Sequence, residues 1–183
     1  MDINEEIRRV IAEADCLYDR EQIGTAIARL AREIGAALAD SHPVVLTVLN
    51  GGIFFAGELL LQLDFPLELD SIKAGRYQGE TRGSAMRWTL TPALPLSGRT
   101  VLVIDDILDE GLTLAEIVRY CEAAGAGRVL TAVLVDKLIG RDKPCRPDFV
   151  GLTAENRYLF GYGLDYKNHL RNWPGIYACR TVY

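Results

Sequence analysis

The stretch VLVIDDILDEGLTL, residues 101–114, decides how this chain of 183 residues is interpreted. Its apolar start predicts a buried strand over residues 100–104, and the apolar spacing after Gly111 predicts a helix that ends near Gly125. A strand, a tight turn and a helix N-terminus form a good phosphate site, because free backbone N–H groups and the positive end of the helix dipole point outward there. Acidic residues are unexpected beside an anion, yet this stretch carries Asp105, Asp106, Asp109 and Glu110.

Strands and helices alternate outward from this stretch. Apolar residues at three- and four-residue steps predict amphipathic helices over 3–11 and 23–38, and the turn Asn50-Gly51-Gly52 separates a strand from a helix over 53 to about 63. The predicted strands are 44–49, 67–74, 100–104 and 128–135. Alternation of this kind implies right-handed crossovers, so we expect an α/β fold with a twisted, mostly parallel sheet and flanking helices on both faces.

Two regions depart from the alternating pattern. GRYQGETRGSAM (75–86) has three glycines among polar residues and no apolar period, so we expect a mobile loop there. Beyond Lys137 the chain changes to short, aromatic, strand-like pieces at 147–152, 157–166 and 176–182. We therefore expect a single domain over 1–183, in which residues 1–15 and about 145–183 contribute a small aromatic hood over the core.

The composition narrows the class of partner. A net charge of -5 and a pI near 5.1 argue against a surface dedicated to nucleic acid or to an anionic membrane, so we expect small-molecule partners. No apolar stretch approaches the roughly 18 residues that a membrane span requires, and the N-terminal segment is acidic and amphipathic, which favours the cytoplasm. The four cysteines are scattered without a C-x-x-C pair, so we expect reduced thiols rather than disulfides or a metal site.

Sheets of this kind bind ligands at the carboxyl ends of their strands. The Asn50-Gly51-Gly52 turn, the acidic turn and Lys137 each follow a predicted strand, so they should converge on one cleft. A ligand that contains both a sugar and a phosphate group would explain why acidic residues lie next to a phosphate site. Its phosphate can bind the N–H groups of residues 110–113 and the Thr113 hydroxyl. The carboxylates of Asp105 and Asp106 can then accept hydrogen bonds from sugar hydroxyls and help to hold a Mg²⁺ ion.

The stretch 101–114 closely resembles the phosphoribosyl-pyrophosphate (PRPP) motif of the type I phosphoribosyltransferases. LNGG (49–52) resembles the pyrophosphate loop of that family, and PDFVG with GYGLDY resembles its purine-binding hood. From about Val44 to Arg171, the order and spacing are similar to those of the hypoxanthine-guanine phosphoribosyltransferases. The resemblance implies a purine-salvage enzyme that uses Mg²⁺ and transfers the 5-phosphoribosyl group from PRPP to hypoxanthine and/or guanine, giving IMP or GMP and pyrophosphate.

The resemblance also implies roles for individual residues. Asp109 would be the catalytic acid-base group facing purine N7, and Lys137 would donate to the exocyclic O6. Phe149 would stack on the ring, with the Val150 backbone near the 2-position. Besides Asp109, the residues implied to bind PRPP are Asp105, Asp106, Leu108, Glu110, Gly111, Leu112 and Thr113, with Asp105 and Asp106 also near the metal. Those implied for pyrophosphate are Asn50, Gly51, Gly52 and Arg171, and those of the flexible loop are Arg76 and Tyr77.

Several positions depart from the pattern of the family, among them Arg76, which precedes Tyr77 where serine is usual. Asn50 stands where many relatives have lysine, which removes a cation from the pyrophosphate side and leaves more of that contact to the N–H groups of Gly51 and Gly52. Glu110 replaces a common threonine, so its side chain should turn to solvent. Asn156 falls where an acidic Mg²⁺ ligand is often found. Relatives form dimers or tetramers, so the resemblance also implies a homodimer or homotetramer.

Other interpretations of the acidic turn stay open. A PRPP-motif regulatory protein that acts on RNA or DNA would need a basic face, and both the acidic balance and Asp109 weigh against it. A phospho-accepting receiver domain also has an Asp pair after a strand, but near its N-terminus rather than at 105–106. Within the enzyme class, a xanthine-preferring phosphoribosyltransferase also keeps an Asp at the position of Asp109, so the sequence does not rank hypoxanthine, guanine and xanthine.

Overall fold

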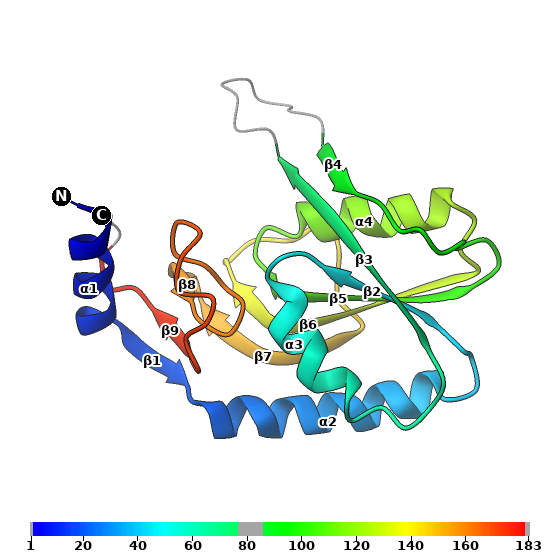
Figure 1. Cartoon of the computed structure of the whole chain (residues 1–183), viewed down its shortest axis with the longest axis horizontal. Helices are drawn as coiled ribbons and strands as arrows, with labels where there is room; N and C mark the ends of the chain where they lie inside the picture. The colour runs from blue at the N-terminus through cyan, green and yellow to red at the C-terminus, as the bar shows by residue number, and fades with distance from the viewer. Residues whose placement is uncertain (1, 77–85, 182–183) are drawn as a thin grey trace.

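A six-stranded sheet forms the centre of the computed structural model, which describes residues 2–76 and 86–181 (Figure 1). Its strands are, in spatial order, β4 (Met86–Leu90), β3 (Glu68–Arg76), β2 (Val44–Val48), β5 (Thr100–Leu108), β6 (Arg128–Leu138) and β7 (Phe149–Glu155). Each strand is parallel to its neighbours except the edge strand β4, which pairs with β3 in the antiparallel direction. The expected α/β fold with a mostly parallel sheet is confirmed.

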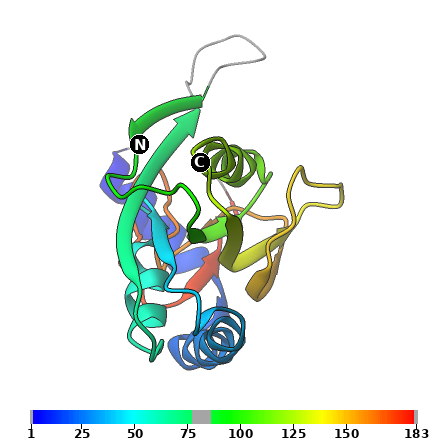
Figure 2. The same cartoon turned by 90° about the vertical axis from the view of Figure 1, so that its right-hand side faces the viewer.

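Helices cover both faces of this sheet. α2 (Arg20–Leu38) and α3 (Gly52–Leu60) lie on one face and α4 (Leu112–Ala123) lies on the other, as the second view shows (Figure 2). Strand residues alternate accordingly: Leu102 of β5 packs in the cluster with α2 and α3, whereas Val103 packs in the cluster with α4. A strand between two helix layers is apolar on both sides, which explains the continuous apolar runs in the sequence.

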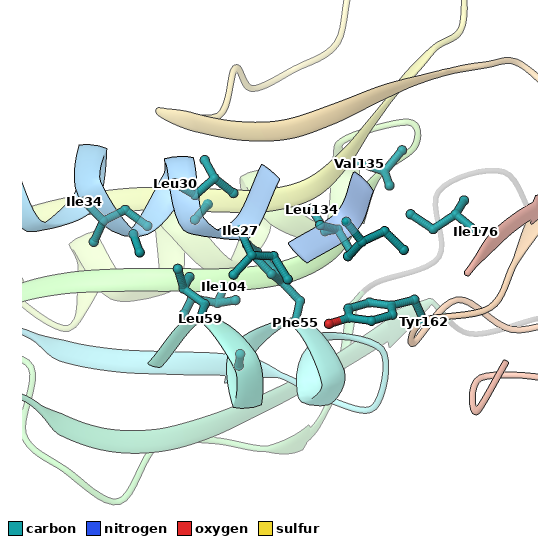
Figure 3. Close-up of a cluster of buried hydrophobic side chains, with 14 of the residues drawn as sticks. Ile27, Leu30, Ile34, Phe55, Leu59, Ile104, Leu134, Val135, Tyr162 and Ile176 are labelled. Atoms are coloured by element: carbon teal, nitrogen blue, oxygen red, sulfur yellow. The ribbon is translucent and has the colours of Figure 1, made fainter. Parts of the chain in front are cut away.

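The larger apolar cluster lies between α2, α3 and the sheet. Ile27, Leu30 and Ile34 recur along one face of α2 and are fully buried. Figure 3 shows these side chains together with Phe55 of α3, while Tyr162 lies at one end of the cluster. The cluster therefore extends from the sheet to the chain segment after β8, which joins the two parts of the fold.

A second, smaller sheet forms the hood. β1 (Asp15–Tyr18), β9 (Ile176–Ala178) and β8 (Leu159–Phe160) are antiparallel neighbours in this order, and α1 (Ile3–Glu13) lies beside them (Figure 1). The hood has its own buried cluster, formed by Val10, Phe160, Tyr166, Leu170 and Cys179. This cluster ties α1 to the segment that follows β8.

Two central strands are longer than the sequence pattern predicts. β5 continues to Leu108 and β6 to Leu138, so Asp105, Asp106 and Lys137 lie within strands rather than directly after them. β5 extends because it pairs with β6 up to Leu108 and Asp136, and the last residues of β6, Lys137 and Leu138, pair with β7. Pairing with a neighbouring strand is not visible in the sequence of one segment. The polar residues at the ends of β5 and β6 therefore resemble turn residues in the sequence.

Other boundaries also differ from the prediction. The pattern does not predict β1 and β4, which are short edge strands without an apolar run. β7 pairs with β6 in the main sheet, so the C-terminal part of the hood begins after Glu155 rather than near residue 145. β3 continues to Arg76, and Tyr77 with the rest of the expected loop up to residue 85 lies outside the described residues.

The four cysteines are unpaired thiols. Cys121 is fully buried in the cluster under α4, and this burial raises the pKa of its thiol to about 11. Among the helices that the structure describes, none is long and apolar enough to cross a bilayer.

The Asp15 carboxylate joins β1 to the last described residues. Arg180 donates to Asp15 Oδ1 at 2.6 Å, and Arg157 donates to Asp15 Oδ2 at 2.7 Å. These two cations, Arg180 first, lower the pKa of Asp15 from 3.8 to about 2. A carboxyl group whose pKa is lower in the folded than in the unfolded state stabilises the fold above its unfolded pKa, and this contribution is lost as the pH falls through the folded pKa.

We therefore expect Asp15→Asn to lower the Tm at neutral pH, by a small amount because the ion pairs are partly exposed. The difference from the unmodified protein should shrink as the pH falls below about 4 and disappear only below about pH 2. Thermal melts across this range measure it, with Asp40→Asn, an exposed carboxylate after α2, as the control. A Tm difference that is constant over the whole range would show that the Asp15 charge is not responsible.

Candidate functional site

A cleft of about 520 Å³ opens at the carboxyl ends of β2, β5 and β6. The ends of these strands line it together with residues 109–114, which lead into α4, and with hood residues between 158 and 171. A parallel sheet with helices on both faces leaves its strand ends open to a ligand. The cleft therefore lies where the sequence predicts a binding site.

The turn between β5 and α4 offers backbone N–H groups to this cleft. Gly111 has a φ of 77°, a left-handed conformation that glycine adopts easily, and α4 begins at the next residue. The N-cap residue of α4 is Gly111, which has no side chain to cap the first turn, so the N–H groups of this turn can bind a ligand, together with the Thr113 hydroxyl. The positive end of the helix dipole adds to them, which makes this turn suitable for a phosphate group.

The Glu110 side chain makes an ion pair at the edge of this turn. Its Oε1 lies 2.5 Å from Arg141 Nη2, and both side chains are largely exposed. The structure thus agrees with the expectation that the Glu110 side chain turns to solvent. Arg141 offsets the negative charge of Glu110 close to a turn that is suited to an anion.

Asp105 and Asp106 form a buried pair of carboxylates in the cleft. Each residue is only 8% exposed. Burial, followed by the neighbouring Asp106 carboxylate, raises the pKa of Asp105 well above its usual range, and burial also raises the pKa of Asp106. Such a pair gains most from hydroxyl donors or a cation. No group of three or more His, Cys, Asp or Glu is arranged to hold a metal among residues 2–76 and 86–181, so a cation here would take its other oxygens from a ligand or water.

Asp109 and Lys137 lie side by side in the cleft. Lys137 Nζ is 2.7 Å from Asp109 Oδ2, and the Lys137 side chain is 12% exposed while that of Asp109 is 49% exposed. The register of the sheet brings them together, because Leu108 of β5 pairs with Asp136 of β6. The two side chains present an acceptor next to a donor, which suits a heterocyclic edge with neighbouring polar atoms.

Gly51 approaches Asp106 so closely that no side chain fits between them. A Cβ atom on Gly51 would overlap the Asp106 carboxylate, and a Cβ atom on Gly163 would overlap the Gly51 carbonyl group. Arg171 holds the hood side of this contact, because its Nη1 donates to Gly163 O at 2.6 Å and its Nη2 lies 2.7 Å from Asp165 Oδ1. The β2–α3 turn, the end of β5 and the hood therefore meet at one point of the cleft.

Only part of the expected pyrophosphate loop lines the cleft. Asn50 and Gly51 do so, whereas Gly52 is the first residue of α3 and packs against the Ile104 carbonyl group. Lys73 of β3 places its Nζ 3.4 Å from Asn50 Oδ1. A cation is thus present beside Asn50, although the sequence has no lysine at that position.

The expectation for Phe149 and Val150 needs correction, because neither residue lines the cleft. β7 pairs them with Ala132 and Val133 in the middle of β6, and both side chains pack against the apolar clusters of the core. The Val150 carbonyl group also accepts a hydrogen bond from Arg29 of α2. β7 runs parallel to β6, so its last residues reach the level of Lys137 and its first residues do not.

Residues of the hood, rather than Phe149 and Val150, line this side of the cleft. Four of them that the sequence pattern does not assign to the site line the cleft, namely Tyr158, Leu159, Leu164 and Asp165. Asn156 is exposed in the turn after β7 and does not line the cleft, so the hood carboxylate there is that of Asp165. The signal available in the sequence is the segment GYGLDY itself, since Asp165 is its only acidic residue.

Known proteins resemble this chain in both sequence and fold. Residues 13–167 match the phosphoribosyl transferase domain. The chain is 36% identical over 161 residues to a hypoxanthine-guanine-xanthine phosphoribosyltransferase of Tritrichomonas foetus, covering 87% of this chain and 88% of that protein. It is 32% identical to a hypoxanthine-guanine phosphoribosyltransferase of Bacillus subtilis, covering 87% and 89%. The solved hypoxanthine phosphoribosyltransferase of Trypanosoma cruzi, in complex with the product IMP, aligns with a TM-score of 0.85 at 29% identity, covering 93% and 97%.

Proposed function

The chain belongs to the phosphoribosyltransferase family, and on this premise we propose that its cleft binds PRPP and a 6-oxopurine. The protein is a purine-salvage enzyme of the hypoxanthine-guanine phosphoribosyltransferase type, which transfers the 5-phosphoribosyl group from PRPP to the base and releases pyrophosphate. The observation that supports this assignment best is the presence in one cleft of a phosphate-binding turn, a buried carboxylate pair and the Asp109–Lys137 pair.

The turn before α4 binds the 5′-phosphate of PRPP. Its N–H groups, in residues 110–113, follow a turn whose N-cap residue, Gly111, has no side chain to compete with a ligand, and Thr113 adds a hydroxyl donor. The ribose hydroxyls then donate to Asp105 and Asp106, whose carboxylates are strong acceptors. This division explains why acids adjoin a phosphate site: one end of the ligand supplies negative oxygens and the other supplies hydroxyl donors.

Asp105 and Asp106 also fit a Mg²⁺ ion. They are adjacent and buried, burial raises the pKa of both, and the described part of the chain offers no larger cluster of metal ligands nearby. Mg²⁺ prefers one or two carboxylates together with substrate phosphates and water. When bound, it neutralises the charge that develops on the leaving pyrophosphate.

Lys137 and Asp109 recognise the edge of the purine. Without a ligand, Lys137 Nζ pairs with Asp109 Oδ2 at 2.7 Å. When the base binds, Lys137 contacts its O6 and Asp109 contacts its N7 in place of this ion pair. As N9 of the base bonds to C1′ and the C1′–O bond to pyrophosphate breaks, the pyrophosphate leaves with the electron pair and the ring gives up its N7–H proton, which Asp109 accepts as the acid-base group. Tyr158, rather than Phe149, provides the aromatic face for the ring.

The pyrophosphate side is formed by Gly51 and by nearby cations. Gly51 has no side chain between its backbone and the ligand, so its N–H group can approach the phosphate oxygens closely. Arg171 lies on the hood side, where Asp165 holds it, and Lys73 lies beside Asn50. These charges assist a leaving group that carries several negative oxygens.

Product identification tests this function directly. The protein is incubated with PRPP, Mg²⁺ and one base at a time, using hypoxanthine, guanine, xanthine and adenine, and the nucleotides are identified by chromatography and mass spectrometry. We expect IMP and GMP, and no AMP. Xanthine is included because the relative from Tritrichomonas foetus carries it in its name. If none of the bases gives a nucleotide, the proposed function is wrong.

The 5′-phosphate site leads to a quantitative prediction. Thr113→Val keeps the shape of the side chain but removes a hydrogen bond to a charged group, so binding of PRPP and GMP should weaken by about 1–3 kcal/mol. Calorimetric titration measures both affinities, and Thr89→Val on the exposed edge strand β4 is the matched control. Unchanged affinity of Thr113→Val for both ligands would remove this turn from the phosphate site.

We also propose that the enzyme is a homodimer or homotetramer and that it acts in the cytoplasm. Ile53 and Phe54 are 49% and 40% exposed on α3, and Leu61 at the end of this helix is 89% exposed. Apolar side chains grouped on one helix are typical of a surface that another chain covers. The cytoplasmic location rests on the four unpaired cysteines, because thiols persist in a reducing compartment.

A further inference from the structure

Lys143 lies in the connection between β6 and β7, and its ammonium group is nearly buried. The side chain is 11% exposed. Its Nζ donates to Leu108 O at 2.7 Å, to Lys137 O at 2.6 Å and to Asp136 Oδ1 at 2.6 Å. An ammonium group has three donors, and here each has an acceptor.

These contacts lie at the point where β5 and β6 separate. Leu108 is the last residue of β5 and pairs with Asp136, after which the chain of β5 turns away toward α4. Lys143 donates hydrogen bonds to the carbonyl groups of Leu108 and Lys137. It therefore links β5 and β6 at the point where their pairing ends. Asp109 is the residue directly after Leu108, whose carbonyl group accepts one of these hydrogen bonds. The other carbonyl group belongs to Lys137 itself.

A separate contact supports the phosphate-binding turn. Cys145 Sγ donates to Gly111 O at 3.2 Å, and the turn has little free space on this side, since a Cβ atom on Gly111 would lie 3.4 Å from Lys143 Cβ. The Cys145 contact does not depend on the Lys143 ammonium group. Loss of the ammonium group should therefore disturb the Asp109–Lys137 side of the cleft more than the phosphate side.

We propose that Lys143 is a positioning residue for the transfer reaction, which fixes the backbone on both sides of the Asp109–Lys137 pair and thereby the two contacts to the purine edge. This inference rests on the proposed function. Lys143 is not among the residues that line the cleft, so a substrate bound there would not contact it. Its effect is transmitted through the Leu108 and Lys137 carbonyl groups, and a displacement of about 1 Å between two such contacts is enough to lower a rate about 100-fold.

The stabilising effect of the Lys143–Asp136 ion pair has to be distinguished from the positioning role of Lys143. Lys143→Met removes all three hydrogen bonds and leaves the partly buried Asp136 without its cation, which destabilises the fold for a reason unrelated to catalysis. Combining Lys143→Met with Asp136→Asn removes the unpaired charge while the two carbonyl contacts stay lost. Asp136→Asn alone is the matched control, because a carboxamide oxygen still accepts from Lys143 and both carbonyl contacts remain.

The experiment compares the Tm, the PRPP affinity and the kcat/KM for hypoxanthine of these variants. We expect the double variant to regain most of the Tm that Lys143→Met loses, but to keep kcat/KM about 100-fold below that of Asp136→Asn. Its affinity for PRPP should change much less. If kcat/KM recovers together with the Tm, Lys143 has only a structural role and the inference is overturned.

A conservative variant covers the case in which the double variant stays unstable. Lys143→Arg keeps the positive charge beside Asp136, but a planar guanidinium group cannot direct three donors from one nitrogen. We expect it to fold with a Tm near that of the unmodified protein and to lose most of kcat/KM. Full activity in Lys143→Arg would overturn the inference. Failure of the unmodified protein to form any nucleotide would be a different result, because it would contradict the proposed function itself.

Discussion

Gly51→Ala is expected to remove nucleotide formation almost completely. The added Cβ atom would overlap the Asp106 carboxylate, which is buried at the end of β5 and has little room to move. The backbone of Gly51 has no room to retreat either, because Gly163 of the hood packs against its carbonyl group. The turn, the carboxylate or the hood must shift, and displacement of a positioned group by about 1 Å lowers the rate by about 100-fold or more.

The measurement is kcat/KM with PRPP and hypoxanthine, together with the Tm. Overpacking should cost about 1–3 kcal/mol of folding free energy, so the Tm shows whether Gly51→Ala still folds under the assay conditions. Gly57→Ala is the matched control, since it makes the same change within α3 at a position where, in the described part of the chain, the new Cβ atom meets nothing within 4 Å apart from the neighbouring backbone of its own helix. It should keep full activity and gain about 0.5–1 kcal/mol. A folded Gly51→Ala that turns over normally would show that the contact with Asp106 is not needed.

The central sheet could be predicted because its signals are local. β2, β5 and β6 contain continuous apolar runs, and glycine turns or helix breakers separate these runs from amphipathic helices, so their α/β order follows from one pass along the chain. β1 and β4 have no such signal. They are strands only because β9 and β3 lie beside them, and the pairing of distant segments is not encoded in a short window.

The same distinction applies to the site. Residues 105–113 are contiguous, so their carboxylates and the phosphate-binding turn could be recognised together. Tyr158 and Asp165 reach the cleft from the hood, whose position depends on tertiary packing through clusters such as that around Tyr166. Phe149 illustrates the opposite error: the resemblance of PDFVG to a purine-binding hood implies a place in the cleft, but β7 pairs Phe149 with Ala132 in the middle of β6.

Buried polar networks are the least visible part in the sequence. Lys143 has the same appearance as any lysine in a polar loop, and lysines are mostly exposed. Its three hydrogen bonds arise because the β6–β7 connection folds back against the ends of β5 and β6. Arg141, only two positions away, is largely exposed and pairs with Glu110 at the surface. Residue type does not distinguish the two positions, and only the path of the backbone does.

Lys137→Met should abolish the preference for 6-oxopurines. The ammonium group has donors and no acceptor, so it pairs with O6 of hypoxanthine or guanine and would face an amino donor in adenine. A site built around a buried hydrogen bond can discriminate by up to about 10⁴-fold against an analogue that leaves a polar group unpaired. Because the Lys137 side chain is only 12% exposed, water cannot easily take the place of the missing partner.

In Lys137→Met we therefore expect kcat/KM for hypoxanthine and guanine to fall steeply, while the ratio of these values to that for adenine approaches one. PRPP affinity should change little, because the phosphate turn and the Asp105–Asp106 pair do not contact Lys137 through any hydrogen bond that the structure describes. Asp109 loses its partner but is half exposed, so water can solvate it and the fold should remain stable. The control is Leu138→Met, the next residue on β6, which is 58% exposed and does not line the cleft. If Lys137→Met keeps full activity with 6-oxopurines and still excludes adenine, the purine edge does not bind at the Asp109–Lys137 pair.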